Sequence, residues 1–106
     1  MRELFVMEKM TFVFSDKKAR ALGYSAQACY EAVDRLFARY GDFKVSEGVY
    51  VGDDSQNAFT AFGVAQRLPD DTNWFLKTID KWFASDDDGE PEDCLEVFYR
   101  IKARNA

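Results

Sequence analysis

The chain has 106 residues, a formal net charge of −5 and no histidine. Its length fits one domain, and its ten Phe, five Tyr and two Trp supply enough large apolar side chains to exclude a disordered chain. The missing histidine excludes mechanisms built on a Ser-His, Cys-His or two-histidine pair, and the acidic balance disfavours a general nucleic-acid binder, whose surface is normally basic.

The first predicted element is a strand over residues 10–15. "MTFVFSD" places Phe12, Val13 and Phe14 in a row, which is typical of a strand buried on both faces. Residues 1–9 are interpreted as a leader that can be disordered, and the rest of the chain as a single domain.

The sequence also predicts the compartment. No apolar run approaches the roughly 18 residues of a membrane span, and "MRELFVMEKM" lacks a cleavage site of small residues. Cys29 and Cys94 stand far apart without a CxxC motif, so we interpret them as free thiols in a reducing compartment. We therefore expect a cytoplasmic protein that does not bind a membrane.

A helix is predicted over residues 24–40. Apolar positions recur there at spacings of three and four, which makes a wide stripe for packing onto a sheet. Ser25 is a suitable N-cap, and Gly41 is placed to close the helix.

The next segment, "YGDFKVSEGVYVGDD", alternates like a strand but is interrupted in its middle. A glycine inside a strand pattern indicates a bulge or a tight bend, so Glu47-Gly48 should divide strands over residues 43–46 and 48–52. The period of two predicts one face formed by Phe43, Val45, Val49 and Val51, and the other by Lys44, Ser46 and Tyr50.

"SQNAFTAFGVAQRL" predicts a helix over residues 55–68, with Ser55 or the residue before it as N-cap. The alternation at Thr60, Phe62 and Val64 leaves a strand as the competing interpretation.

The last third of the chain is harder to assign. Apolar residues recur every fourth position in "NWFLKTIDKWFAS", and this spacing fits a helix or a strand. Over residues 91–103 the acids of the first turn and the bases of the last predict a helix, because these charges match the helix dipole. A closing strand with Leu95, Val97, Tyr99 and Ile101 on one face is the competing interpretation.

Ser15-Asp16 is the most suggestive polar pair. It lies at the carboxyl end of the first predicted strand and is followed by Lys17, Lys18 and Arg20. A carboxylate at this place could hold a metal ion, and the bases could neutralise phosphate. The competing interpretation is an ordinary turn between a strand and a loop, with Asp16 exposed.

The order of these segments resembles the virulence-associated protein D family. The resemblance rests on "GYSAQACYEAV", then "LFARYGDFKVSEGVYVGDD", then "AFGVAQRLPDDTNWF", and it covers roughly residues 10–83. A more distant resemblance is to the small ferredoxin-like, nuclease-related subunit of CRISPR adaptation complexes. In the family, the interrupted strand pair belongs to a modified ferredoxin-like fold.

The resemblance implies an α+β sandwich of the order β-α-β-β-α-β-α, in which helices cover one sheet. It favours a strand over residues 76–85 and a helix at the C-terminus. We expect a right-handed crossover between the first two strands, and neither a purely antiparallel sheet nor a helical bundle. The expected core consists of Phe12, Phe14, Ala32, Val33, Leu36, Phe37, Val45, Val49, Phe62, Leu68 and Ile79.

The resemblance also implies a function, namely that of an endoribonuclease of toxin–antitoxin type that forms a homodimer and meets RNA or an antitoxin protein. In this interpretation Asp16 binds Mg²⁺ or activates water, Ser15 assists by hydrogen bonding, and the three following bases neutralise phosphate. The family's candidate catalytic acid directly follows the phenylalanine that ends the first strand. Here Ser15 follows Phe14 and the acid comes one residue later, a shift that turns a strand side chain to the other face.

The rival interpretation is a catalytically inactive ferredoxin-like module that binds a protein partner. The shifted acid, the absence of histidine and the net charge of −5 favour it.

Overall fold

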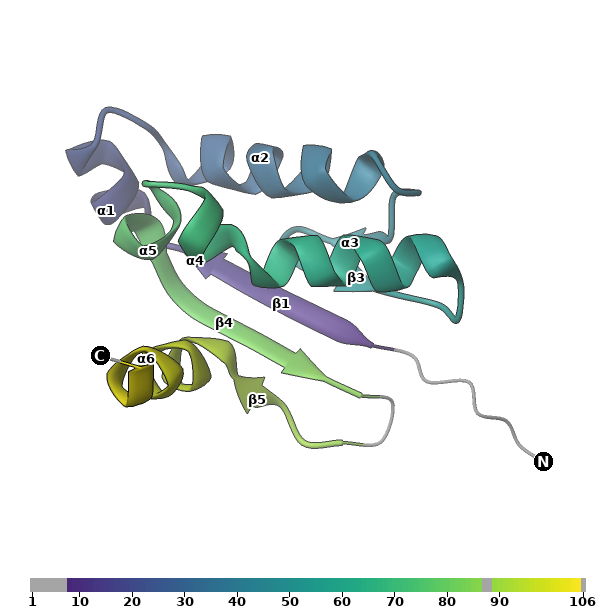
Figure 1. Ribbon diagram of the computed structural model, residues 1–106. Helices are drawn as coiled ribbons and strands as arrows, with labels where there is room; N and C mark the ends of the chain where they lie inside the picture. The colour runs from purple at the N-terminus through teal and green to yellow at the C-terminus, as the bar shows by residue number, and fades with distance from the viewer. Residues whose placement is uncertain (1–7, 87–88, 106) are drawn as a thin grey trace.

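The computed structural model describes residues 8–86 and 89–105. Within these ranges the chain is a mixed α+β structure with a five-stranded open sheet of order β2-β3-β1-β4-β5 (Figure 1). The strands are β1 (Lys9–Phe14), β2 (Lys44–Ser46), β3 (Val49–Val51), β4 (Ile79–Ser85) and β5 (Glu92–Asp93). The helices are α1 (Asp16–Ala21), α2 (Ala26–Ala38), α3 (Gln56–Gln66), α4 (Leu68–Asp71), α5 (Phe75–Thr78) and α6 (Cys94–Asn105).

The longer elements follow the expected order, but the sheet corrects one expectation. Every neighbouring pair of strands in the described chain is antiparallel, so the prediction that the sheet would not be purely antiparallel was wrong. Strands β1 and β2 do run parallel to each other, because both pair antiparallel with β3, which lies between them. The helical connection α2 therefore joins parallel strands that are not neighbours.

Strand β1 is central and is buried mainly on one face. Met10, Phe12 and Phe14 are buried, whereas Val13 is 37% exposed. The expectation of burial on both faces was wrong, because α2 and α3 pack on the same side of the sheet (Figure 1). The predicted leader mostly lies outside the described residues, and β1 already includes Lys9.

A serine caps each of the first three helices, α1, α2 and α3. Ser25 and Ser55 accept hydrogen bonds at the starts of α2 and α3, which confirms both predicted helices and their caps. Ser15 caps α1 in the same way, although no helix was predicted there. The chain leaves α2 through Gly41 and Asp42, which both have positive φ.

The interruption at Glu47-Gly48 is confirmed as the turn between β2 and β3. Gly48 has a φ of +77°, and a Cβ atom there would lie 2.4 Å from the Phe12 carbonyl oxygen. Only glycine satisfies both conditions. In β3, however, the buried face is the opposite of the expected one, because Tyr50 is fully buried, and Val45 of β2 is 62% exposed rather than buried.

The C-terminal third confirms the predicted strand and helix but shifts their starts. The strand begins at Ile79 rather than residue 76, because Phe75–Thr78 forms the short helix α5. Helix α6 begins at Cys94, after the two-residue strand β5 has paired with β4. The alternatives of a strand over residues 55–68 and a long closing strand are both excluded.

The core is aromatic and lies between the sheet and the helices. Seven of the eleven predicted core residues are buried, Ala32, Leu36 and Val49 are half-buried, and Val45 is exposed. The hydrophobic pattern missed buried positions in several elements, among them β1, α2, β3, α5 and β4. The buried residues that were not predicted include Met10, Cys29, Tyr50, Phe75 and Trp82. In the part of the chain that the structure describes, no helix has the length and apolarity to span a membrane.

Candidate functional site

Ser15 and Asp16 lie where β1 passes into α1. The Ser15 hydroxyl accepts a hydrogen bond from the Lys18 backbone N–H at 3.0 Å. Asp16 is the first residue of α1, where a negative charge is favoured by the helix dipole. The local sequence therefore forms a capped helix start rather than an open turn, and the Ser15 side chain is used for capping.

The Asp16 carboxylate joins α1 to the start of α2. Its Oδ1 accepts from the Ala26 backbone N–H at 2.9 Å, and its Oδ2 accepts from Arg20 Nε at 2.5 Å. The Ala26 hydrogen bond, followed by the Arg20 hydrogen bond, lowers the pKa of Asp16 below its ordinary value. The group is ionised at neutral pH and is about half exposed.

The three predicted phosphate-binding bases do not converge on one point. Arg20 pairs with Asp16, and Lys18 Nζ lies 2.8 Å from Asp80 Oδ1 at the start of β4. Lys17 is exposed on α1. The structure thus brings Asp16 and Arg20 together and directs Lys18 toward β4.

The arrangement does not fit a dedicated Mg²⁺ site. Both oxygens of Asp16 already accept hydrogen bonds from donors within the chain. Among the described residues, no group of three or more Asp, Glu, Cys or His side chains is placed to hold a metal ion. No reaction step through a metal follows from these residues.

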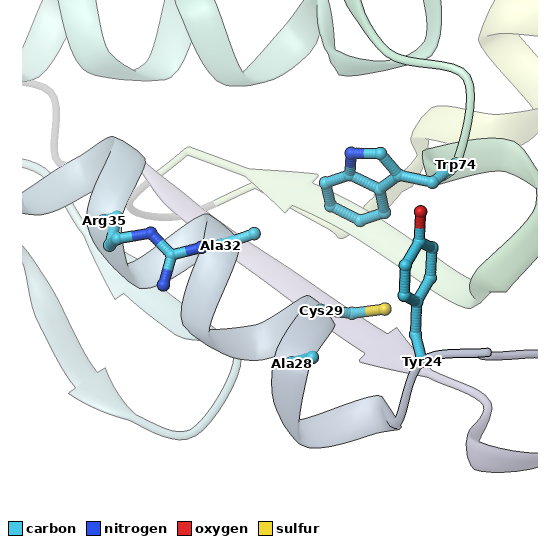
Figure 2. Close-up of a pocket in the computed structure, with 6 residues that line it drawn as sticks. All are labelled: Tyr24, Ala28, Cys29, Ala32, Arg35 and Trp74. Carbon is cyan, nitrogen blue, oxygen red and sulfur yellow. The ribbon is translucent and has the colours of Figure 1, made fainter. Parts of the chain in front are cut away.

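A pocket opens next to this helix start, between α2 and the segment that leads into α5. Its volume is about 220 Å³, and it is lined by Tyr24, Ala28, Cys29, Ala32, Arg35 and Trp74. In Figure 2 the Trp74 ring lies across from α2, with Tyr24 at one end of the pocket and Arg35 further along the helix. Two aromatic rings, two alanines and one cation make a surface for a planar apolar group that carries negative charge.

The pocket and the Asp16 carboxylate both lie where the chain turns from α1 into α2, and we call this region the α1–α2 corner. Tyr24 lies between α1 and α2, and its backbone N–H donates to the Ala19 carbonyl at 2.9 Å. Two residues later, Ala26 donates to Asp16. One of these two hydrogen bonds around the Tyr24 turn therefore also occupies the Asp16 carboxylate.

Cys29 lines the pocket, and its sulfur points toward the Tyr24 ring (Figure 2). Burial raises the pKa of the Cys29 thiol, so the group is protonated at neutral pH. A buried, protonated thiol is a poor nucleophile, and we assign Cys29 a packing role.

A second polar cluster connects α2 with the β2–β3 pair. Asp34 accepts hydrogen bonds from the buried Tyr50 hydroxyl and from Lys44 Nζ, the latter at 3.0 Å. Burial, followed by the Asp34 hydrogen bond, raises the pKa of Tyr50 far above its ordinary value. Because all three groups satisfy one another, this cluster serves the fold.

Sequence analysis did not identify the pocket residues as a site. Tyr24 and Trp74 entered within the segments that carry the family resemblance. A usable signal was present, since Ala28, Ala32 and Arg35 follow helical spacing and form a strip of small side chains with one cation. The aromatic side chain across the pocket, Trp74, lies 42 positions beyond Ala32 in the sequence. A local sequence pattern cannot indicate that two residues so far apart are close in space.

Comparisons with known proteins identify no relative: no family model, no curated protein and no solved structure matches the chain.

Proposed function

We propose that the chain binds unpaired RNA at its α1–α2 corner and does not cut it. The observation that supports binding is the separation of charge along the chain. Residues 16–40 carry five basic and three acidic residues, whereas residues 79–96 carry one basic and eight acidic residues. A chain with net charge −5 thus still offers a basic segment to phosphate.

Three of the bases are available to a ligand. Lys17, Arg35 and Arg39 are exposed and form no ion pair with any carboxylate of residues 8–86 or 89–104. Arg35 and Arg39 are four residues apart on or beside α2, so they share one side of the helix. Phosphate contacts from such bases bind RNA without reading its sequence.

The state of Asp16 supports the absence of cleavage. Both carboxylate oxygens hold α1 against α2, and a carboxylate with a lowered pKa is a weak general base at neutral pH. In this proposal Asp16 has a structural role, because its carboxylate links α1 to the start of α2.

Metal-assisted cleavage of RNA, which would need Asp16, is the second candidate. The observation that favours it is that Asp16 is ionised and half exposed beside the basic segment. An assay on mixed RNA, with and without Mg²⁺, compares the wild type with Asp16→Ala. We expect no cleavage by either protein. Cleavage by the wild type that is lost in the variant would replace our proposal with the ribonuclease.

Binding is tested by fluorescence anisotropy with a labelled, unstructured oligoribonucleotide. We expect the double variant Arg35→Gln/Arg39→Gln to bind more weakly and to show a salt slope that is shallower by roughly one to two. The control Lys81→Gln/Arg104→Gln removes the same charge elsewhere. Equal weakening by both double variants would mean that only the overall charge matters.

We propose a ferredoxin-like type for the fold. Two features support it: the order β2-β3-β1-β4 with β1 central, and helices α2 and α3 on one face. Strand β5 and helix α6 are then additions to this four-stranded unit. An experimental structure with a different neighbour for β1 would contradict this assignment.

We also propose a cytoplasmic homodimer. Support comes from the sheet face opposite α2 and α3, which carries apolar side chains from three strands, and from Val45, which is 62% exposed on the edge strand β2. The apolar residues of that face are Val13, Val49, Val51 and Phe83, and the polar Thr11 lies among them. Both cysteines are free thiols, in keeping with a reducing compartment. Sedimentation of a monomer at tens of micromolar would contradict the dimer.

A further inference from the structure

The pocket of Figure 2 is too small for a whole nucleotide and suits a single ring system. Its volume of about 220 Å³ lies below the range of roughly 300–1,000 Å³ that is usual for larger ligands. The lining side chains are mostly apolar, with Ala28 and Ala32 on the α2 side and the Trp74 ring across from them. A flat group can lie against the indole, because the two alanines leave room on the helix.

Arg35 places a cation at the rim of the pocket, next to the apolar part that a ring can fill. It is exposed, lines the pocket, and forms no ion pair within the described residues. Its position toward the end of the pocket away from Tyr24 leaves the guanidinium outside the apolar part (Figure 2). A ligand that fills the pocket with a ring and extends an anion past the rim satisfies both features.

We infer that the pocket takes one unpaired nucleobase, which stacks on Trp74 while its own phosphate group meets Arg35. This inference rests on the proposed RNA binding and adds the recognition of one base to it. Stacking on an aromatic side chain tolerates every base, because each base has a π-face. The pocket therefore selects for unpaired RNA rather than for a particular base.

The described residues provide a built-in reporter. Trp74 lines the pocket, whereas Trp82 is 2% exposed in the core. We expect the oligoribonucleotide to quench the Trp74 fluorescence. In Trp74→Phe, where Trp82 is the remaining tryptophan, the quenching should disappear.

A matched pair of variants tests the pocket itself. Ala32→Leu fills the pocket with a side chain that favours helices, and Ala38→Leu places the same side chain at the exposed end of α2. We expect Ala32→Leu to weaken oligoribonucleotide binding about tenfold, in line with the loss of one stacked base. Ala38→Leu should bind like the wild type, and both variants should keep the far-UV circular dichroism of the wild type.

A second measurement needs no variant. Adenosine 5′-monophosphate should quench Trp74 and compete with the oligoribonucleotide, whereas ribose 5-phosphate at the same concentration should do neither. Equal effects of the two compounds would show that the base does not enter the pocket, and would overturn the inference.

The outcomes separate the inference from the function on which it rests. If Ala32→Leu and Ala38→Leu both bind RNA like the wild type, the base pocket is wrong and backbone binding stands. If the wild type binds no oligoribonucleotide at low salt, the proposed function fails and the inference fails with it.

Discussion

The two ends of the sheet differ in how their charges are matched. At the end where β1 finishes, Asp16 pairs with Arg20 and Lys18 pairs with Asp80. Helices α1 and α5 meet there, and Trp74 packs on Phe14 with ring centroids 6.0 Å apart. At this end Lys18 and Trp74 have partners from other elements, and Arg20 pairs with Asp16 within α1.

The end where β1 begins is rich in acids, although Lys9 is the first residue of the strand there. Glu8, Asp53 and Asp54 line one hollow there, of about 320 Å³, with the 76%-exposed ring of Phe59 beside them. Within the described residues, none of the three carboxylates forms an ion pair. The Asp53 carboxylate accepts from the Ser55 backbone N–H at 2.9 Å and serves the turn before α3.

This difference shows why the net charge of the chain is a poor guide to its surface. The acids that set the value of −5 are concentrated beyond residue 78, and the helices next to the pocket carry a basic surplus. A ligand that meets one end of the sheet experiences a different field from a ligand that meets the other, because solvent and salt screen charges beyond about 10 Å.

The largest expected effect compares one glycine from each end. Gly48→Ala should destabilise the fold by about 3 kcal/mol or more, because the residue has positive φ and the new Cβ would strike the Phe12 carbonyl oxygen. Gly52→Ala should cost about 1–2 kcal/mol, since its Cβ would lie 2.8 Å from a ring carbon of Phe62, a side chain that can shift. Urea unfolding monitored by circular dichroism measures both. Equal losses would contradict the claim that the β2–β3 turn is the more rigid position.

Removal of one aromatic ring from each end gives the next effect. Trp74→Ala should lower the free energy of unfolding by about 2–3 kcal/mol, because the ring packs against Phe14 and Phe75. Phe59→Ala should change it by less than about 0.5 kcal/mol, because the ring is mostly exposed. The same urea titrations apply. A large loss for Phe59→Ala would show that this ring is covered in solution.

The smallest effect is a pH dependence at the acidic end. Burial, followed by repulsion from Asp86, raises the pKa of Glu8. The unfolded chain then loses this proton more readily than the folded chain, so Glu8 destabilises the fold at neutral pH, and the penalty disappears as pH falls through the raised pKa. Glu8→Gln should stabilise the fold at pH 7 by less than about 1 kcal/mol.

The opposite end responds to pH with the opposite sign. The pKa of Asp16 is lowered, so the stability that its contacts contribute is present above the ordinary pKa and is lost only as pH falls through the lower folded value. For Glu8, the difference in unfolding midpoint between the wild type and Glu8→Gln should shrink as the pH falls from 7 to about 4, below the ordinary pKa of a glutamate. If the difference is constant over this range, Glu8 does not titrate as proposed.

Much of the fold could be predicted because its signals are local. The Ser25 and Ser55 caps, the apolar stripe of α2 and the break at Glu47-Gly48 all depend on residues within a few positions of one another. The start of β4 could not be placed, because Phe75–Thr78 has a spacing that fits both helix and strand, and it becomes a helical turn where it packs against α1 and α2.

The candidate site was predicted by position but not by role. Ser15, Asp16 and Arg20 do lie together at the end of β1, as their closeness in the sequence required. The Ser15 cap is local, since it binds the Lys18 backbone N–H, but the role of Asp16 depends on Ala26. The Ala26 backbone N–H reaches Asp16 only after the chain has turned between α1 and α2. A pattern of residue types does not report which donors will occupy a carboxylate.

The sequence by itself determined the α+β class, three of the strands, the long helices and the glycine turn, since hydrophobic period, caps and positive φ act over short distances. Tertiary structure decided which face of β3 is buried. A period of two defines two faces but does not rank them, and Tyr50 faces the helices because it pairs with Met10 of β1 and its hydroxyl finds Asp34 on α2. The pocket was decided in the same way, because Trp74 and Ala32 meet only when α2 and the segment before α5 pack on the same side of the sheet.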